Sequence, residues 1–363
     1  MDRLRTRVGT VALKNPLIAA PAEHFIDPAG VRAAIAAGAG AVVVKSTNES
    51  EAARDQLRRA EYAVLDAHWR PVPWDSTAPR DVTIACRSGL SPLGFDDWLT
   101  ALIELDRVAR QHDCLVVASL VVADLGAAVE MARRVGASTV RALELNVGTP
   151  YGNVAAKGAV STELEPARVR EIVAAVRAAV ALPVWVKVTG QSERVPALAD
   201  AAFAAGADAV VMAGRLLGFL PDLDTQAPLL GTSLGVGGYW NLPLTCQWLA
   251  ATRAAVGPDR ALIGINGAQD GEDIARLMLA GASAVGMASA IMLRGYDVIP
   301  SSLAQLDDYL AAKGMCAQDL VGRAADRRQS FAALPIRPDP WRPFVPPWPA
   351  DRPQPTAPTK EHP

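Results

Sequence analysis

The sequence predicts a (β/α)8 barrel, the TIM barrel, an α/β fold in which eight parallel strands alternate with helices. Short apolar runs recur along the chain, an alanine-rich helical stretch follows each run, and a glycine-containing turn precedes several of them. We count eight such runs, the number of strands that closes this barrel. The length of 363 residues could hold two ordinary domains. Because barrels of about 250 residues form one domain, one barrel with extensions is the simpler interpretation.

The eight apolar runs define the expected strands. A doubly wound open sheet is the alternative, but no G-x-G-x-x-G motif follows the first run. The expected strands are Leu17–Ala20, Ala41–Lys45, Leu115–Ser119, Val140–Leu145, Val184–Val188, Ala209–Ala213, Ala261–Gly264 and Ala284–Met287.

Glycines mark the ends of several expected helices. Each can take the left-handed conformation that caps a helix before the chain enters the next strand. These glycines are Gly38, Gly136, Gly206 and Gly281.

Two segments fall outside the repeat. Residues 47–113, between the second and third strands, contain the motif S-G-L-S-P-L-G-F at 88–95, and long loops on this side of a barrel are usually functional. From about residue 329 the chain is too rich in proline for a helix or a sheet interior. We therefore expect a barrel domain over 1–328 and a docked arm or a disordered tail over 329–363.

Composition narrows the function. Half of the residues are hydrophobic, and the net charge of -2 gives no general attraction to nucleic acid or anionic lipid. The four cysteines form no C-x-x-C pair, which argues against a metal or iron–sulfur site and fits a reducing compartment. No signal peptide and no run of about 20 apolar residues is present. We expect a cytoplasmic protein with a small-molecule substrate, without nucleic-acid or membrane partners.

Glycine motifs follow the last two strands, where TIM barrels commonly bind phosphate. They read Gly264-Ile265-Asn266-Gly267 and Gly286-Met287-Ala288-Ser289. Glycines let main-chain N–H groups converge on an anion. A phosphate site predicted in this way would suit a sugar-phosphate isomerase, an aldolase or a flavin enzyme.

Two lysines end strands that are otherwise apolar. Lys45 ends the second expected strand, and Lys187 lies at the end of the fifth within V-W-V-K-V. A charge among buried apolar neighbours needs an anionic partner, so both lysines indicate an anion at the barrel mouth.

The fourth strand leads into L-E-L-N-V-G-T-P-Y-G-N at 143–153. This segment resembles the substrate loop of the dihydroorotate dehydrogenase family, where E-L-N runs into S-C-P-N or S-S-P-N. N-P-L-I-A-A-P-A at 15–22 and V-V-V-K-S-T around Lys45 resemble the same family. The resemblance covers about residues 8–314 and extends to the pyrimidine-reducing domain of dihydropyrimidine dehydrogenase.

The resemblance implies FMN as the cofactor. Lys187 matches the lysine at the reducible end of the flavin, where a cation favours the reduced ring. The family's relatives often pair, so a homodimer is expected, and a separate electron-transfer partner stays open. Positions matched to flavin contacts are Ala20, Pro21, Lys45, Ser119, Asn146, Lys187, Gly237, Gly238, Gly264, Asn266, Gly267, Gly286, Met287, Ala288 and Ser289.

The substrate side departs from the family. Its asparagines, which match the polar edge of a pyrimidine, are replaced by Cys86, Pro92 and Tyr151, while Asn146 remains. Each unpaired polar group of a buried pyrimidine would cost about 1–3 kcal/mol. Dihydroorotate is therefore not the expected substrate. A new polar set is expected at the mouth instead. It includes Glu23, after the first strand, and the expected substrate-binding residues are His24, Cys86, Tyr151 and Arg215.

Thr149 occupies the position of the family's general base. We expect it to exchange a proton with the substrate while Lys45 and Asn146 hold a carbonyl or carboxylate. Thr149 could instead be a turn residue, in which case His24, Cys86 or Tyr151 becomes the proton-transfer candidate.

The expected function is thus an FMN-dependent oxidoreductase. It would transfer hydride between flavin N5 and a carbon–carbon bond beside a carbonyl in a small cyclic or carboxylated metabolite. A flavin-free barrel isomerase or lyase, with Lys187 or Lys45 forming a Schiff base, is one alternative. A non-catalytic, flavin-binding homologue is another.

Overall fold

The computed structural model describes residues 2–149, 160 and 162–344. The chain divides into two compact units, Met1–Asp326 and Arg327–Pro363. The described part of the second unit contains two short 3-10 turns, Phe331–Ala333 and Arg342–Phe344.

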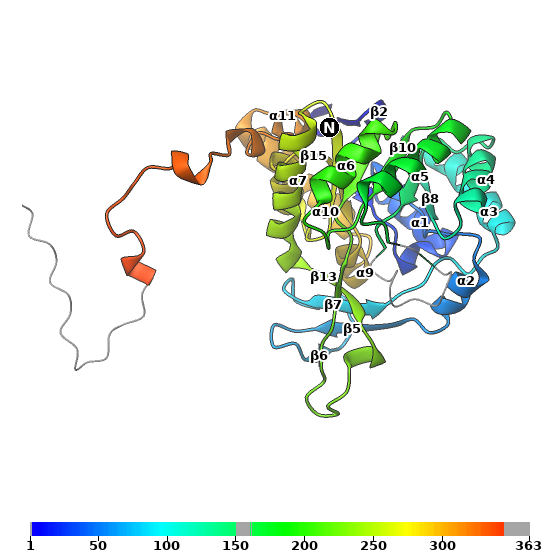
Figure 1. Cartoon of the computed structure of the whole chain (residues 1–363), viewed down its shortest axis with the longest axis horizontal. Helices are drawn as coiled ribbons and strands as arrows, with labels where there is room; N and C mark the ends of the chain where they lie inside the picture. Colours follow the sequence, from blue (N-terminus) through cyan, green and yellow to red (C-terminus); the bar gives the residue numbers. More distant parts are fainter. Residues whose placement is uncertain (1, 150–159, 161, 345–363) are drawn as a thin grey trace, which may run out of the picture. The chain divides into compact units, whose positions relative to one another are not determined.

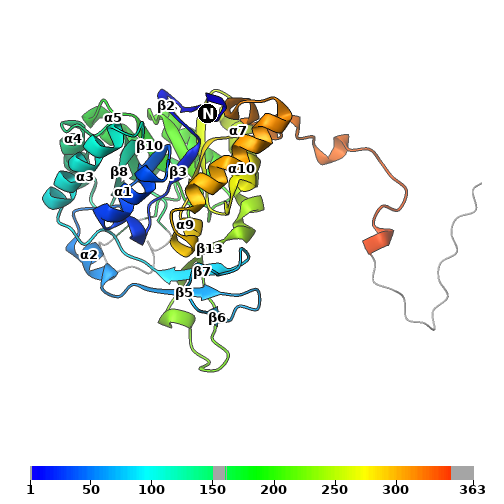
Figure 2. The same cartoon turned by 180° about the vertical axis from the view of Figure 1, so that it is seen from behind.

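The first unit is a closed barrel of parallel strands, which confirms the predicted fold (Figures 1 and 2). Neighbouring strands follow one another in sequence order around the barrel. They are β3 (Leu17–Ala19), β4 (Ala41–Val43), β8 (Leu115–Val121), β9 (Leu143–Asn146), β10 (Val184–Lys187), β11 (Ala209–Met212), β14 (Ala261–Ile265) and β15 (Ala282–Met287).

Several strand ends differ from their expected positions by one to three residues, including those of two strands that lead to candidate site residues. Strand β4 stops at Val43 because the N–H of Lys45 turns away from the sheet and donates to the carbonyl of Phe25. Strand β9 begins at Leu143 and ends on Asn146. Lys45 therefore lies in the loop after its strand, whereas Asn146 closes the strand itself.

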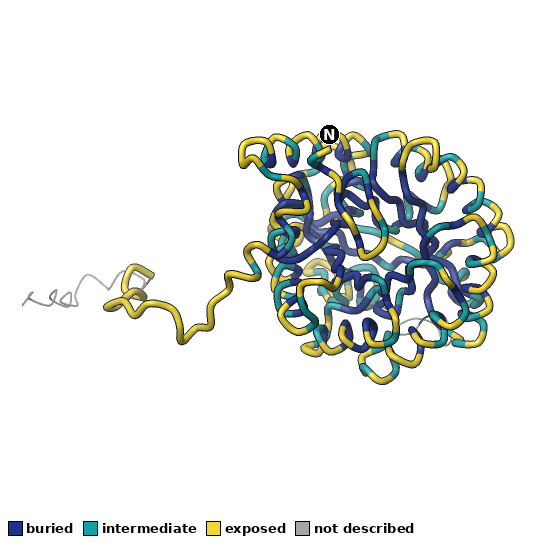
Figure 3. Tube along the Cα trace, turned by 90° about the horizontal axis from the view of Figure 1, so that it is seen from above, coloured by how far each residue is buried: buried dark blue, intermediate teal, exposed yellow. Residues whose placement is uncertain are grey.

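Helices surround the barrel, and the buried residues fill the space between helices and strands (Figure 3). Met278 and Leu306, for example, are fully buried in this layer. The helices are α1 (Pro28–Ala36), α2 (Glu51–Leu57), α3 (Phe95–Arg110), α4 (Leu125–Gly136), α5 (Pro166–Ala179), α6 (Val195–Ala204), α7 (Leu242–Val256), α8 (Gly271–Leu279), α9 (Ser289–Arg294), α10 (Val298–Lys313) and α11 (Ala317–Leu320). Over the described residues, no helix is both long and apolar enough to cross a membrane.

Three of the four expected glycine caps have the predicted conformation. Gly38, Gly206 and Gly281 have positive φ values of 99°, 98° and 124°. Gly136 is different: it is the last helical residue of α4, and Ala137 caps the helix in the right-handed region. A Cβ at Gly136 would lie 3.1 Å from Cγ1 of Val180, so this glycine serves close packing.

A second core fills the barrel interior. Trp185 of β10 is fully buried there, with Val117 of β8, Val211 of β11 and Ile263 of β14. A hairpin of β1 (Thr6–Val8) and β2 (Val11–Leu13) adds the buried Val8 and Leu13 to the same cluster. The N-terminal hairpin thus closes one end of the barrel.

A five-stranded antiparallel sheet, here called the mouth sheet, covers the other end (Figures 1 and 2). It combines two insertions, one after β4 and one after β11. The end of the expected 47–113 insertion is α3, the barrel helix that follows β4. The sheet's strands, in spatial order, are β12 (Leu216–Gly218), β13 (Leu234–Gly238), β7 (Thr83–Arg87), β5 (Glu61–Leu65) and β6 (Pro71–Val72).

Strand register determines which mouth-sheet residues face the barrel. Gly237 pairs with Ile84, and Cys86 pairs with Tyr62 on the next strand. Because directly opposed residues share a face and alternate residues return to it, these four positions lie on one side of the sheet.

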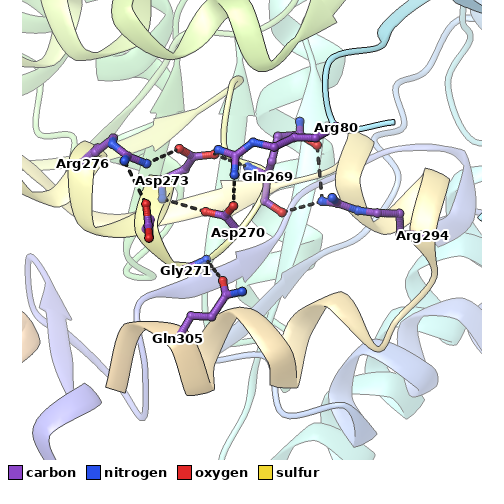
Figure 4. A network of polar contacts seen from close by, with 9 residues as sticks. Arg80, Gln269, Asp270, Gly271, Asp273, Arg276, Arg294 and Gln305 are labelled. Atoms are coloured by element: carbon purple, nitrogen blue, oxygen red, sulfur yellow. Dashed lines mark hydrogen bonds and ion pairs between the residues drawn. The ribbon is translucent and has the colours of Figure 1, made fainter. Parts of the chain in front are cut away.

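Ion pairs connect the mouth sheet to the barrel (Figure 4). Arg80, in the loop between β6 and β7, pairs with Asp270 and Asp273 at the start of α8. Asp273 is buried and also accepts from Arg276 and from the N–H of Gln269. Arg294 of α9 donates to the carbonyl of Gln269. The loop before β7 is thereby fastened to the loop after β14.

Trp185→Ala should destabilise the barrel by about 3–5 kcal/mol, because it removes a fully buried aromatic side chain and leaves a cavity. Urea unfolding followed by circular dichroism would measure the loss. Trp69→Ala is the matched control, since Trp69 is 52% exposed. Equal destabilisation by the two substitutions would contradict the assignment of Trp185 to the interior core.

Arg80→Gln should loosen the loop before β7 at a cost on the order of 1 kcal/mol, because Arg80 is half exposed and its ion pairs are partly screened. Hydrogen exchange in residues 73–82 should rise while the barrel strands stay protected. Arg58→Gln removes an exposed ion pair with Asp55 at the end of α2 and is the control. Unchanged exchange around Arg80 would rule out this fastening.

Candidate functional site

Two adjoining hollows lie at the barrel mouth beneath the mouth sheet. Both are lined by Pro21, Lys187, Gly214 and Arg215, so they form one continuous site. Parallel strands place their carboxyl ends at this end of a barrel, where active sites of the fold are found.

The first hollow, here called the small-residue hollow, lies beside the ends of β14, β15 and β3. Its wall has small side chains and no carboxylate among the described lining residues, with Lys187 and Arg215 providing positive charge. Such a wall leaves room for a flat, anionic group beside exposed main chain. Predicted cofactor positions in this wall are Ala20, Pro21, Lys187, Gly237, Asn266, Gly267, Gly286, Ala288 and Ser289.

The second hollow, here called the lysine hollow, contains the predicted chemical groups. Lys45, Asn146 and Thr149 line it together with Lys187 and Arg215. The residues of the S-G-L-S-P-L-G-F loop that reach it are Ser88, Gly89 and Leu90. The structure therefore brings the candidate base, the retained asparagine and three cations to one cavity.

Thr149 is positioned by the turn that follows β9. Asn146 Oδ1 accepts from the N–H of Gly148 at 3.1 Å, which folds the chain back immediately after the strand. The carbonyl of Thr149 accepts from Thr162 Oγ1. With only 7% of its surface exposed, Thr149 is held at the wall of the lysine hollow.

Lys45 forms a buried ion pair. Its Nζ lies 2.7 Å from Oε1 of Glu23, and the two side chains are 7% and 18% exposed. Burial lowers the pKa of Lys45, although the Glu23 charge opposes this shift. Burial would raise the pKa of Glu23, but the charges of Lys45 and Arg215 outweigh it and hold the pKa at about 2. Glu23 is therefore a carboxylate.

Lys187 has a different setting. Within the described residues, no carboxylate lies at ion-pair distance from its amine. Burial lowers its pKa, and the Glu144 charge opposes that shift. Oε1 of Glu144 accepts from Ser119 Oγ at 2.9 Å. Lys187 thus borders both hollows with its charge only partly compensated.

Arg215 connects the barrel to the mouth sheet. Its Nη1 contacts Cys86 Sγ, and its Nη2 donates to Ser88 Oγ at 2.9 Å. The guanidinium lines both hollows. Cys86, expected to bind substrate, is itself fully buried and is absent from the described walls of both hollows.

Several expected site residues lie elsewhere. His24 lines neither hollow: its ring packs on Phe25 near Tyr296, and burial lowers its pKa to about 3, so it is neutral. Ser119 is fully buried and bonds to Ser46 and Glu144. Tyr151 falls outside the described residues. Gly238, Gly264 and Met287 are absent from the described walls of both hollows.

Tyr62 was not singled out from the sequence. Its hydroxyl is buried close to Glu23, and burial, followed by the Glu23 charge, raises its pKa. Only the antiparallel pairing of β5 with β7 brings it to the mouth. No local motif marks it.

Across the described ranges, no group of three or more His, Cys, Asp or Glu side chains is arranged to hold a metal ion. The four cysteines are free thiols.

Comparison with known proteins identifies the family. The family model described as Dihydroorotate dehydrogenase matches residues 71–310. Dihydroorotate dehydrogenase B (NAD(+)), catalytic subunit, of Methanosarcina acetivorans is 30% identical over 306 residues, which cover 83% of this chain and 89% of the relative. The corresponding subunit of Anoxybacillus flavithermus is 29% identical over 317 residues, 86% of this chain and 93% of that protein.

A third relative matches over a shorter stretch. Dihydroorotate dehydrogenase A (fumarate) of Lactobacillus helveticus is 36% identical over 164 residues, 45% of this chain and 52% of the relative. The match of the family model to most of the barrel, together with the full-length relatives, shows that the chain belongs to the dihydroorotate dehydrogenase family.

Proposed function

We propose that this protein is an FMN-dependent oxidoreductase acting on a carbon–carbon bond beside a carbonyl. The observation that carries the proposal is the continuity of the two hollows: a small-residue wall suited to a flavin adjoins a cavity lined by Lys45, Asn146 and Thr149. Family membership supports the same cofactor.

FMN fits the small-residue hollow. The glycines and alanines after β14 and β15 would hold the phosphate, and Lys187 would lie at the reducible end of the ring system. When bound, FMN supplies the centre that accepts or donates hydride. The positive charge of Lys187 would stabilise negative charge on the reduced ring.

The chain's own residues would orient the substrate and move its proton. Asn146 and Lys45 would bind the carbonyl or carboxylate in the lysine hollow. Thr149 would exchange a proton at the carbon next to the one that exchanges hydride. Because these groups lie at one wall, substrate binding would also orient the reacting carbons, and such orientation is a large part of catalysis.

The substrate is proposed to differ from dihydroorotate. Two family asparagine positions are occupied by Cys86 and Pro92, and Cys86 contacts Arg215. A guanidinium at the cavity wall suits a carboxylate, which it can bind through two parallel hydrogen bonds. Because dihydroorotate also carries a carboxylate, it is the loss of the asparagine amides that favours a carboxylated metabolite with fewer amide groups.

One observation favours a flavin-free alternative. Burial lowers the pKa of Lys187, and a neutral amine is the form that attacks a carbonyl to form a Schiff base. Borohydride trapping of a lysine adduct in flavin-free protein would support a lyase or isomerase over the oxidoreductase.

The partner proposal also follows from the family. Two of the relatives are named catalytic subunits of an NAD(+) enzyme, so a separate electron-transfer subunit is one candidate acceptor. A homodimer is the proposed assembly of the chain itself.

FMN added to the purified protein should bind at one equivalent and show the visible absorption of a protein-bound flavin. Lys187→Met should retain the flavin but lower its reduction potential, because a positive charge beside the ring is lost. Absorbance titration and anaerobic redox titration provide the two measurements. A protein that gains no bound FMN would contradict the proposed function.

Thr149→Ala should slow flavin reduction by the substrate about 100-fold or more, whereas Thr149→Ser should remain close to wild type, because only serine retains the hydroxyl. An anaerobic screen of carboxylated metabolites would first supply the substrate, and stopped-flow absorbance would then give the rate. Equal rates in the alanine and serine variants would show that Thr149 is a turn residue and not the proton-transfer group.

A further inference from the structure

Glu23 lies on a short, firmly anchored turn between β3 and α1. The turn is the 3-10 segment Glu23–Phe25, with the Phe25 side chain buried against the barrel. Asp27 caps the following helix by accepting from the N–H of Ala29. The carbonyl of Phe25 accepts from the N–H of Lys45 at 3.3 Å. The main-chain segments that carry Glu23 and Lys45 are therefore fixed relative to each other.

Lys45 is held at both ends. Trp98 Nε1 donates to its carbonyl at 3.0 Å, and its Nζ lies 2.7 Å from Glu23 Oε1. The side chain between these points lines the lysine hollow. Removing the carboxylate would leave the ammonium in place but without its counter-ion.

The charges around Lys45 make this counter-ion decisive. Arg215 immediately precedes β12, and Lys187 ends β10. The positive charges of both residues repel the charge of Lys45. Cys86 of β7 is the other titratable neighbour, and Tyr62 of β5 borders Glu23. Glu144 of β9 acts on Lys187. Among the described residues, Glu23 is thus the carboxylate that stabilises charged Lys45.

We propose that Glu23 is a positioning residue that keeps Lys45 charged and directed into the lysine hollow. The use of that charge, to bind the substrate or stabilise the reduced flavin, rests on the proposed function. The pairing of Glu23 with Lys45 is independent of that function. The Glu23 carboxylate offsets the effect of burial on Lys45. Without it the pKa of Lys45 should fall, so the lysine should lose its proton at a lower pH than in the wild type.

Lysine NMR tests this directly, because the chain has only six lysines. Protein labelled with 13C at lysine Cε would be titrated from about pH 6 to pH 10.5, around the ordinary lysine pKa. Lys45→Met and Lys187→Met assign the two buried signals. No flavin or substrate is required.

In Glu23→Gln, the pKa of Lys45 should fall by about one unit or more relative to wild type, while that of Lys187 should stay or rise slightly. Glu23→Asp, which keeps a carboxylate, should give a pKa of Lys45 between the two. Glu144→Gln is the crossed control: it should lower the pKa of Lys187 and leave Lys45 nearly unchanged.

A Lys45 signal that titrates at the same pH in wild type and Glu23→Gln would overturn the proposal. So would a neutral Lys45 throughout the wild-type titration. Circular dichroism must first show that each variant is folded; if Glu23→Gln is not, Glu23→Asp still discriminates, because a purely structural role would leave the pKa of Lys45 unmoved.

If the protein proves to be an FMN oxidoreductase, the alkaline limb of kcat/KM should also move to lower pH in Glu23→Gln and return towards wild type in Glu23→Asp. Failure of FMN binding would defeat the proposed function while leaving the lysine titration interpretable. The two inferences are therefore separable.

Discussion

Burial of positive charge at the barrel mouth is the constraint on which the rest of the site depends. Lys45 and Lys187 are enclosed by apolar strands, and an uncompensated charge in such surroundings is strongly disfavoured. Glu23 compensates the first through direct contact. Among the described residues, no carboxylate lies at ion-pair distance from Lys187, and Glu144 compensates its charge only from further away, so an anionic ligand beside it would be stabilised.

One face of the mouth sheet borders both the predicted cofactor side and the predicted substrate side of the site. Its register places Ile84 and Gly237 at the small-residue hollow, and Cys86, on the same face, contacts Arg215, which lines both hollows. Arg80 fastens the approach to β7 onto the loop after β14. A shift of this sheet would therefore change both hollows together, which couples the predicted cofactor and substrate sides.

The sequence was informative where structure follows from local patterns. Strand runs, helix-ending glycines and the turn after Asn146 are each encoded within a few neighbouring residues, and the barrel is confirmed. Positions that depend on the pairing of strands far apart in the sequence were not predicted. Tyr62 reaches the mouth only because β5 pairs with β7, and β7 in turn pairs with β13, about 150 residues further along the chain.

Glu23 and His24 illustrate the same limit at the scale of one turn. In a 3-10 segment successive side chains diverge by about 120°. Glu23 consequently meets Lys45, whereas His24 packs towards Tyr296 and lines neither hollow. Adjacent residues that looked equivalent in the sequence thus have different roles, and only the backbone conformation separates them.

The departures from the family pattern are physically connected. Cys86 stands where a family asparagine is expected, Arg215 follows the sixth barrel strand, and the two side chains are in contact. Ser88 adds a second hydrogen bond to the same guanidinium. Independent decay of an unused site would favour isolated changes with unpaired buried groups. A substituted and mutually bonded set instead supports the proposed change of substrate, with Arg215 as the cation that contacts both Cys86 and Ser88.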